Sequence, residues 1–408
     1  MAWIIGWFNI PHMYQDFLGQ WKLCAYALRG IDPYPLIGVK VPAVEELGSI
    51  PKDWGTTPYG LLLGNLFYAG FLAMSMAAFI PDAQNSFQKA LGAYRATNAP
   101  LEPAEIYFIV LNVIFLLATA IIIFQTFKNL SKKLAWTSVL LAIFSFSLLI
   151  PLKNTGNASS IICCMLILIA FCHEKYPKLS GILLAFAMVK PQLALIFCLT
   201  LLLMRRFKIL FIAAAIDISA WLIVSFITKT GPSVLLTEFL ATGAGGDKSY
   251  AGIFTLFTAS DHHLAVGLSM LAGIIYVCIG HKLLSECKIS VFKFFPACIA
   301  LTFWCYSFYN EFYILVLPVI VCVYVMIESN KMAIPFVSAL FMTIGIFFWM
   351  SFILNGTISK LMGGVDWNSL LSLTSVPDYV VHTWITRTFF ESVIILIGVY
   401  LCRRLKNI

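Results

Sequence analysis

Long apolar runs, separated by short polar segments, make up most of the chain. The runs are about 18–24 residues long and do not alternate apolar with polar residues, which favours helices over strands. Two shorter runs meet at Lys190-Pro191, and a proline inside an apolar run predicts a broken helix. The predicted helical segments are 104–127, 134–151, 158–172, 179–189, 191–204, 209–227, 263–280, 294–309, 312–327, 335–354 and 388–402.

The composition identifies lipid as the main solvent of this chain. Of its 408 residues, 61% are hydrophobic, 15% aromatic and only 11% charged, whereas soluble proteins carry roughly 25% charged residues. A soluble enzyme, a disordered chain and a disulfide scaffold are therefore excluded. Because only helices and closed barrels satisfy their backbone groups in lipid, the sequence predicts an all-α polytopic membrane bundle. We expect about 10–12 transmembrane or re-entrant helices.

The positive charges collect in one alternate set of loops. The net charge is +8, and one set of short loops holds 14 Lys and Arg, against six in the opposite set from residue 151 onward. The positive-inside rule then places the basic set in the cytoplasm and the long loops 228–262 and 355–387 outside the cell membrane. No nucleic-acid-binding motif accompanies the charge, so we expect no nucleic-acid partner. The basic loops are 128–133, 173–178, 205–208, 281–288, 328–332 and 403–406.

The amino-terminal part leaves two topologies open. The segment 58–80 begins at a proline and holds Gly60, Gly64 and Gly70, which fits either a full span or a re-entrant helix in the outer leaflet. We expect one membrane domain over 1–408. Residues 1–57 form its first extracytoplasmic loop, 58–80 a re-entrant or juxtamembrane helix, and 104–402 the transmembrane bundle.

Asp16 is the candidate catalytic carboxylate. A helix predicted over 17–28 ends at Gly30, a common helix-terminating residue, and Asp32-Pro33 then turns the chain toward Tyr34. As a bare pattern, Asp16 is a helix N-cap followed by a turn. As chemistry, it is a carboxylate at the membrane surface and a credible general base, beside aromatic residues that can stack on a sugar ring: Trp21, Tyr26 and Tyr34.

Lys190 is the candidate phosphate ligand. A lysine between two apolar half-segments is expensive in lipid, so it either lines a polar cavity or extends to an interface. A broken helix also offers free backbone donors, which together with the ammonium suit a phosphate. Gln192 and Asn157 are the polar residues nearest to this break and to the preceding polar turn.

The other polar residues and the cysteines also have structural interpretations. Asp217, inside an apolar run, can bond a neighbouring helix. The 11 cysteines lie mostly in apolar runs without a CxxC pair, which favours buried small side chains over metal or disulfide chemistry. The residues that could line a sugar or acceptor pocket are Asp32, Tyr34, Trp54, Tyr59, Asn157, His262, His263, Tyr309 and Glu311.

Taken in order, these pieces resemble glycosyltransferase family 87, whose members have the GT-C fold. The resemblance covers roughly 14–320 and rests on four elements together with a late span. They are Asp16-Phe17 with Gly30-Ile31-Asp32-Pro33-Tyr34, Thr57-Pro58-Tyr59, Gly156-Asn157, and Gly181-Ile182-Leu183-Leu184-Ala185 with Lys190-Pro191-Gln192; Tyr306–Pro318 is similar to a late span. Asn157 stands where the family usually has Gln.

The resemblance implies an inverting transferase that moves a sugar, mannose in the typical member, from a polyprenyl-phosphate donor to a glycan or glycolipid acceptor. Asp16 would take the acceptor proton and Lys190 with Gln192 would hold the donor phosphate, with no cofactor or metal. Family members also carry a full span before the catalytic loop. Only 15 residues precede Asp16 here, which leaves open a truncated start, a misassigned start, or Met1–Ile10 as the end of a lost first span.

Three other functions fit parts of the pattern. Broken helices with intramembrane polar groups also suit a transporter or flippase of lipid-linked sugars. A non-catalytic membrane subunit and a polymerase or ligase of lipid-linked glycans share the same architecture. Sugar transfer in detergent separates the transferase from the transporter, and product length separates it from the polymerase.

Overall fold

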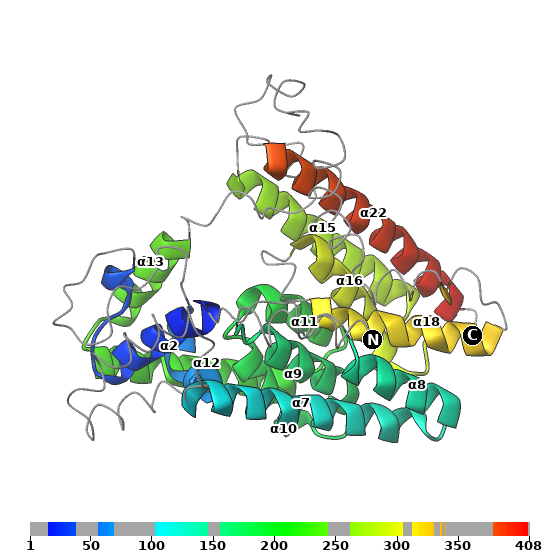
Figure 1. Ribbon diagram of the computed structural model, residues 1–408, viewed down its shortest axis with the longest axis horizontal. Coiled ribbons are helices and arrows are strands. Elements are labelled where there is room, and N and C mark those ends of the chain that lie inside the picture. Colours follow the sequence, from blue (N-terminus) through cyan, green and yellow to red (C-terminus); the bar gives the residue numbers. More distant parts are fainter. Residues whose placement is uncertain are drawn as a thin grey trace, which may run out of the picture. The chain divides into compact units, whose positions relative to one another are not determined.

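The computed structural model describes residues 15–37, 56–68, 103–145, 156–243, 262–304, 312–329 and 378–406, together with 335–336 and 339. Every regular element in these ranges is a helix (Figure 1). The chain divides into two compact units: Met1–Ile122 with Leu148–Asp247, and Ile123–Ser147 with Lys248–Ile408. The expected single membrane domain over 1–408 stays a prediction.

The first unit contains the candidate site. Its central helix is α9, in which nearly every side chain is buried. The helices α10, α11 and α12 follow it in the chain and pack around it or one another, and α2 and α3 pack on α12. The helices of this unit are α2 (Gln15–Leu28), α3 (Gly60–Leu63), α4 (Asn65–Tyr68), α7 (Pro103–Phe127, which continues into the second unit), α9 (Ser159–Cys172), α10 (Pro177–Ala187), α11 (Pro191–Leu203), α12 (Phe207–Thr228) and α13 (Pro232–Gly243).

The second unit is built around α16, which packs against α15, α18 and α22 (Figure 1). Tyr313, just before α18, fastens this part of the chain to α8, because its buried hydroxyl donates a hydrogen bond to the Ala142 carbonyl at 3.1 Å. The elements are α8 (Lys132–Ile143), α15 (His262–Leu283), η5 (Ser290–Phe294), α16 (Phe295–Trp304), η6 (Phe312–Leu315), α18 (Val316–Ser329) and α22 (Asp378–Lys406).

Most predicted segments within the described ranges are helical, and the predicted break at Lys190-Pro191 is confirmed. Three boundaries differ from the prediction. Helix α8 stops at Ile143, the predicted external loop 228–262 contains α13, and α22 begins at Asp378, inside the other predicted external loop. The segment 58–80 is described only to residue 68, where it forms the two single turns α3 and α4 with Gly64 between them.

Gly30 ends α2 as predicted. Its φ of +78° lies in the left-handed region that favours glycine. The Gly30 amide bonds to the Ala27 carbonyl at 3.1 Å and the Ile31 amide to the Tyr26 carbonyl at 3.1 Å, which is the hydrogen-bond pattern of a Schellman stop. A Cβ at Gly30 would lie 3.1 Å from the Ile227 carbonyl, so α2 ends tightly against the end of α12.

Two hydrogen bonds of the first unit show which ends of α9, α10 and α11 lie together. Lys190, between α10 and α11, reaches the start of α9, whereas Arg206, after α11, reaches Glu174 beyond the end of α9. Helices α9 and α11 therefore run in the same direction, and α10 runs back between them. We call these the Lys190 end and the Arg206 end; α12 starts at the latter with Phe207.

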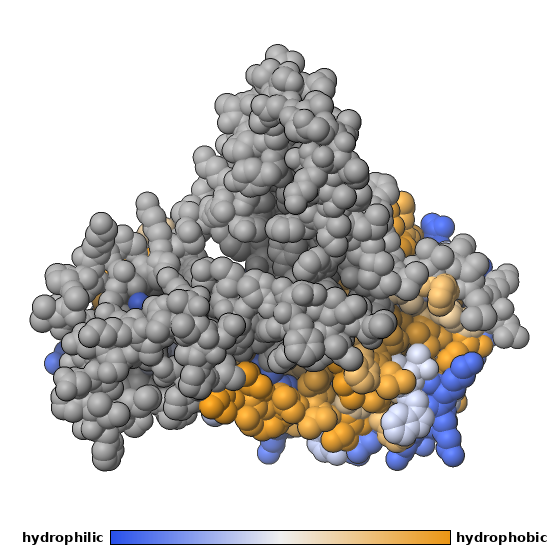
Figure 2. Space-filling view, viewed as in Figure 1, coloured by the Kyte–Doolittle hydropathy of each residue, from blue (hydrophilic) through white to orange (hydrophobic). Residues whose placement is uncertain are grey.

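Two helices within the described ranges are long and apolar enough to cross a membrane: Ile106–Phe127 and Phe207–Thr228, each of 22 residues. Each covers about 33 Å, slightly more than a hydrocarbon core of ~30 Å. Figure 2 shows hydrophobic residues over a continuous area of the described surface. On α12, Phe211 and Phe226 are 76% and 85% exposed. Such apolar exposure is compatible with a membrane protein.

Candidate functional site

A charged side chain from one helix break lies at the start of another helix. The half-buried Lys190 donates hydrogen bonds to Ser159 Oγ, at 2.7 Å, and to Asn157 Oδ1. Both partners belong to the first turn of α9 or to the residues before it. Lys190 does not, therefore, simply extend away from the protein. It places a cation at a helix N-terminus, where amide groups already favour anions.

Asn157 organises this cluster. Its Oδ1 accepts from the Ser159 amide at 3.0 Å and from the Ser159 hydroxyl at 2.8 Å, in addition to the Lys190 ammonium. Gly156 precedes it with φ +64°, a conformation that glycine adopts without strain. Asn157 and Lys190, both predicted site residues, are thus in direct contact, whereas their roles in binding stay predictions. Gln192, also expected here, is half-buried in the first turn of α11.

Tyr68, which no sequence pattern singles out, joins this cluster to α2. Its buried phenol oxygen accepts the Ala158 amide at 3.2 Å, directly before α9. Its ring stacks on Phe108 with centroids 6.3 Å apart and meets the Phe17 ring edge-on at 5.8 Å. Phe17 also contacts Phe108 at 5.4 Å. Three helices, α2, α4 and α7, therefore meet at these rings.

Asp16 lies in the first turn of α2, which begins at Gln15, so the helix starts earlier than predicted and Asp16 is inside it rather than its N-cap. A negative residue is favourable there because the turn carries the positive end of the helix dipole. The neighbouring Phe17 contacts Tyr68, and Tyr68 contacts Ala158. The backbone of Asp16 therefore lies in the same region of the first unit as the Lys190 cluster. The proposed catalytic role of Asp16 stays a prediction.

A second polar group surrounds Asp32 and Tyr34. The Tyr34 amide donates to Asp32 Oδ1 at 3.1 Å, and the Tyr34 hydroxyl donates to the Thr56 carbonyl at 2.7 Å, before α3. Burial, followed by the negative charge of Asp32, raises the pKa of Tyr34. Tyr34 is 3% exposed, so it fastens the chain internally instead of presenting its ring to a sugar. Trp21 and Tyr26 are likewise buried.

Glu238 on α13 adds a carboxyl group to this second cluster. Burial and the neighbouring Asp32, which also hydrogen bonds to it, raise the pKa of Glu238 above its ordinary value. The next residue, Phe239, lies 6.4 Å from the Tyr34 ring between centroids. Tyr59, another predicted pocket residue, is half-buried before α3. α13 therefore packs on the turn that Asp32 begins.

The remaining predicted site residues lie elsewhere in the chain. Trp54, Tyr309 and Glu311 lie outside the described residues. His262 and His263 form the first turn of α15, in the second unit, and only their backbone is described. Over the described part of the chain, no group of three or more His, Cys, Asp and Glu residues could hold a metal ion.

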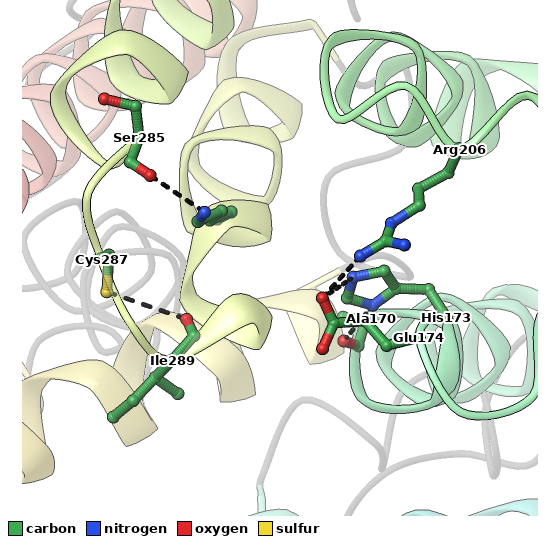
Figure 3. Close-up of polar contacts among 8 residues, drawn as sticks. Ala170, His173, Glu174, Arg206, Ser285, Cys287 and Ile289 are labelled. Atoms are coloured by element: carbon green, nitrogen blue, oxygen red, sulfur yellow. Dashed lines mark hydrogen bonds and ion pairs between the residues drawn. The ribbon is translucent and has the colours of Figure 1, made fainter.

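The Arg206 end has a different chemistry. The Arg206 guanidinium donates to Glu174 Oε1 at 2.5 Å, and His173 Nδ1 lies 2.9 Å from the Ala170 carbonyl (Figure 3). Burial lowers the pKa of His173, so this histidine is neutral at physiological pH. Figure 3 shows Arg206 and His173 converging on Glu174. The remaining cations at this end are Lys175, Lys178, Arg205 and Lys208.

Comparison with known families indicates the class of protein. Residues 96–279 match the family model of glycosyltransferase family 87. This match indicates a glycosyltransferase. It covers α7 to α13, most of α15 and the Lys190 cluster, whereas α2, α3 and α4 precede it. Neither a curated protein nor a solved structure gives a match.

The residues that the sequence analysis missed are Tyr68, Ser159 and Glu238. No local pattern marks them, because each gains its position from a contact between segments distant in the chain. Ser159 stands 31 residues before Lys190, and Tyr68 stands 90 residues before Ala158. Ser159 alone carried a weak signal, since a serine two residues after Asn157 opens an apolar run, a common place for a helix to start.

Proposed function

We propose that the protein is a membrane-embedded inverting glycosyltransferase with a GT-C-like helical bundle. It transfers a sugar, with mannose as the first to test, from a polyprenyl-phosphate donor to a glycan or glycolipid acceptor at the extracytoplasmic face of the cell membrane. The family 87 match supports the transferase class. The observation that carries the finer proposal is the Lys190 ammonium at the start of α9, beside Asn157 and Ser159.

The chemistry requires a cation where a phosphate leaves. Asp16 takes the proton of an acceptor hydroxyl while that oxygen forms a bond to C1 of the sugar, and the bond from C1 to the phosphate oxygen breaks. The polyprenyl phosphate departs as an anion, which a nearby ammonium and helix N-terminus stabilise. One displacement inverts C1, so one carboxylate suffices. The scheme uses no metal or cofactor.

The exposed apolar helix faces support a lipid-linked donor. The exposed apolar faces of α7 and α12, with Ile114 54% and Phe226 85% exposed, suit contact with hydrocarbon. The donor chain would lie along these helices, its phosphate at the Lys190 end. The acceptor would approach from the Asp32 and Tyr59 side, where α13 packs.

The decisive experiment is transfer of radiolabelled sugar from polyprenyl phosphate by the purified protein in detergent. We expect Asp16→Asn to abolish transfer while donor binding and folding persist, because the acceptor proton then has no base. Retained turnover would remove Asp16 from this role. A transporter would show no transfer at all in detergent.

Lys190 is tested separately. We expect Lys190→Ala to raise the KM for the donor and to lower kcat by about 10²-fold, because the leaving phosphate loses its cation. Lys178→Ala is the matched control, since Lys178 is an exposed lysine at the Arg206 end and should leave both constants unchanged. A Lys190→Ala protein with normal kinetics and only a lower Tm would reduce Lys190 to a structural residue.

A further inference from the structure

The contacts of Tyr68 connect the two halves of the proposed site. Its phenol oxygen accepts the Ala158 amide at 3.2 Å, one residue before α9, and its ring meets Phe17 at 5.8 Å, one residue after Asp16. Tyr68 is 2% exposed and Phe17 5% exposed. Tyr68 is therefore a packed element of the protein interior whose two ends touch the helix starts that bear the proposed base and the proposed phosphate site.

We propose that Tyr68 is a positioning residue. It holds the first turn of α2 at a fixed position relative to the first turn of α9, and we call this relative position the register. The inference rests on the proposed transferase function, since register matters only if Asp16 and the phosphate act on one sugar. Tyr68 does not need to touch the substrate. It acts through Phe17 on the backbone of Asp16 and through Ala158 on the turn that binds Lys190.

The aromatic packing makes this link stiff. Phe17, Tyr68 and Phe108 contact one another pairwise, with centroids 5.4–6.3 Å apart. Asn112, one turn after Phe108 on α7, accepts a hydrogen bond from Ser160 at 2.5 Å, and Ser160 is the second residue of α9. The ring cluster and α9 are thus joined twice, once through Tyr68 and once through α7. A small displacement of the reacting groups lowers kcat far more than it lowers the affinity for the substrate.

Tyr107 offers a matched control in the same region. Its hydroxyl donates to the Leu66 carbonyl of α4 at 2.9 Å, so it also fastens α4 to its surroundings by a phenol hydrogen bond. That bond joins α7 to α4, whereas the phenol of Tyr68 bonds to the residue before α9. Tyr107→Phe and Tyr68→Phe therefore each remove a phenol oxygen that anchors the same small helix, and only the second removes the bond to Ala158.

The test compares kcat, KM for the polyprenyl-phosphate donor and Tm of the full-length protein in detergent. We expect Tyr68→Phe to lower kcat about tenfold with little change in KM, because donor binding depends on Lys190 and only the transition state needs the register. Tyr107→Phe should change kcat less than twofold at an equal loss of Tm. Equal effects of the two variants on kcat, or a rise in KM alone, would overturn the proposal.

A second variant and a second readout keep the test independent of activity. If Tyr68→Phe does not fold, Phe17→Leu loosens the ring contact while the Tyr68 hydrogen bond remains, and the same kcat loss is expected. Amide hydrogen exchange should also quicken at the first turns of both α2 and α9 in Tyr68→Phe, and faster exchange at only one of them contradicts the coupling. If the wild-type protein transfers no sugar, the proposed function fails, whereas hydrogen exchange still reports on the register.

Discussion

Glu238 on α13 and Asp32 form a carboxyl pair, and the packing of α13 favours the protonated form of Glu238. A protonated Glu238 donates a hydrogen bond to Asp32, and burial with the neighbouring negative charge raises its pKa above the ordinary value of 4.5. A raised carboxyl pKa means that the packed state binds the proton more tightly than the released state. Its contribution is therefore complete below the ordinary pKa and is lost as pH rises through the raised value.

We accordingly expect α13 to be docked more firmly in acid than at neutral pH. Hydrogen exchange of the α13 amides, corrected for the intrinsic effect of pH, should show stronger protection at about pH 4.5 than at about pH 8. Glu238→Gln should remove this pH dependence, because the amide is neutral and still donates to Asp32. Glu286→Gln, at an exposed glutamate in the second unit, serves as the control. An unchanged pH profile in Glu238→Gln would show that protonation of Glu238 does not cause the pH dependence.

Helix α10 packs on α12 through a glycine. A Cβ at Gly181 would lie 2.7 Å from Ile212 Cβ and 3.1 Å from the Ile209 carbonyl, neither of which is the flexible end of a side chain. We expect Gly181→Ala to destabilise the protein by about 1–3 kcal/mol through overpacking. Gly267→Ala in α15 meets nothing within 4 Å and should be neutral or stabilise by up to ~1 kcal/mol. Thermal unfolding of both variants in detergent measures the difference, and equal Tm values would contradict close packing at Gly181.

Helix starts and stops were predictable where one residue dictates them. Gly30 and the Lys190-Pro191 pair act through their own backbone preferences, so the end of α2 and the break between α10 and α11 follow from sequence alone. Helix α13 was missed because polar and small residues flank it and its run is only 12 residues. Its packing on the turn at Asp32 stabilises this helix, which its own sequence does not predict.

The members of the site were easier to predict than their contacts. Lys190 and Asn157 stand out as polar residues between apolar runs, but their hydrogen bond spans 33 residues of sequence. Tyr34 shows the reverse case. An aromatic beside Asp32 looks suited to stacking on a sugar, yet the fold buries it and uses its hydroxyl on Thr56. Burial depends on tertiary packing, which the local pattern does not contain.

Charge separates the two ends of the first unit and thereby supports an orientation. The Arg206 end carries the cations Lys175, Lys178, Arg205, Arg206 and Lys208, together with the acid Glu174. At the far end of α12, the cations Arg29, Lys190 and Lys229 are accompanied by the carboxyl pair of Asp32 and Glu238. The positive-inside rule would place the Arg206 end in the cytoplasm and the Lys190 cluster on the outer side, as in the proposed function.

This orientation predicts which side of the membrane each end is reached from. In intact cells a membrane-impermeant maleimide should label Lys229→Cys but not Lys175→Cys, and both should be labelled once the membrane is opened, with the native cysteines giving the background. Lys175 and Lys229 are exposed and stand at opposite ends of the unit, and α12 covers about 33 Å between them. Labelling of both positions from outside would mean that α12 does not cross the bilayer. Labelling of Lys175→Cys alone would show that the bundle has the opposite orientation. A polyprenyl-phosphate sugar would then have to react on the cytoplasmic side.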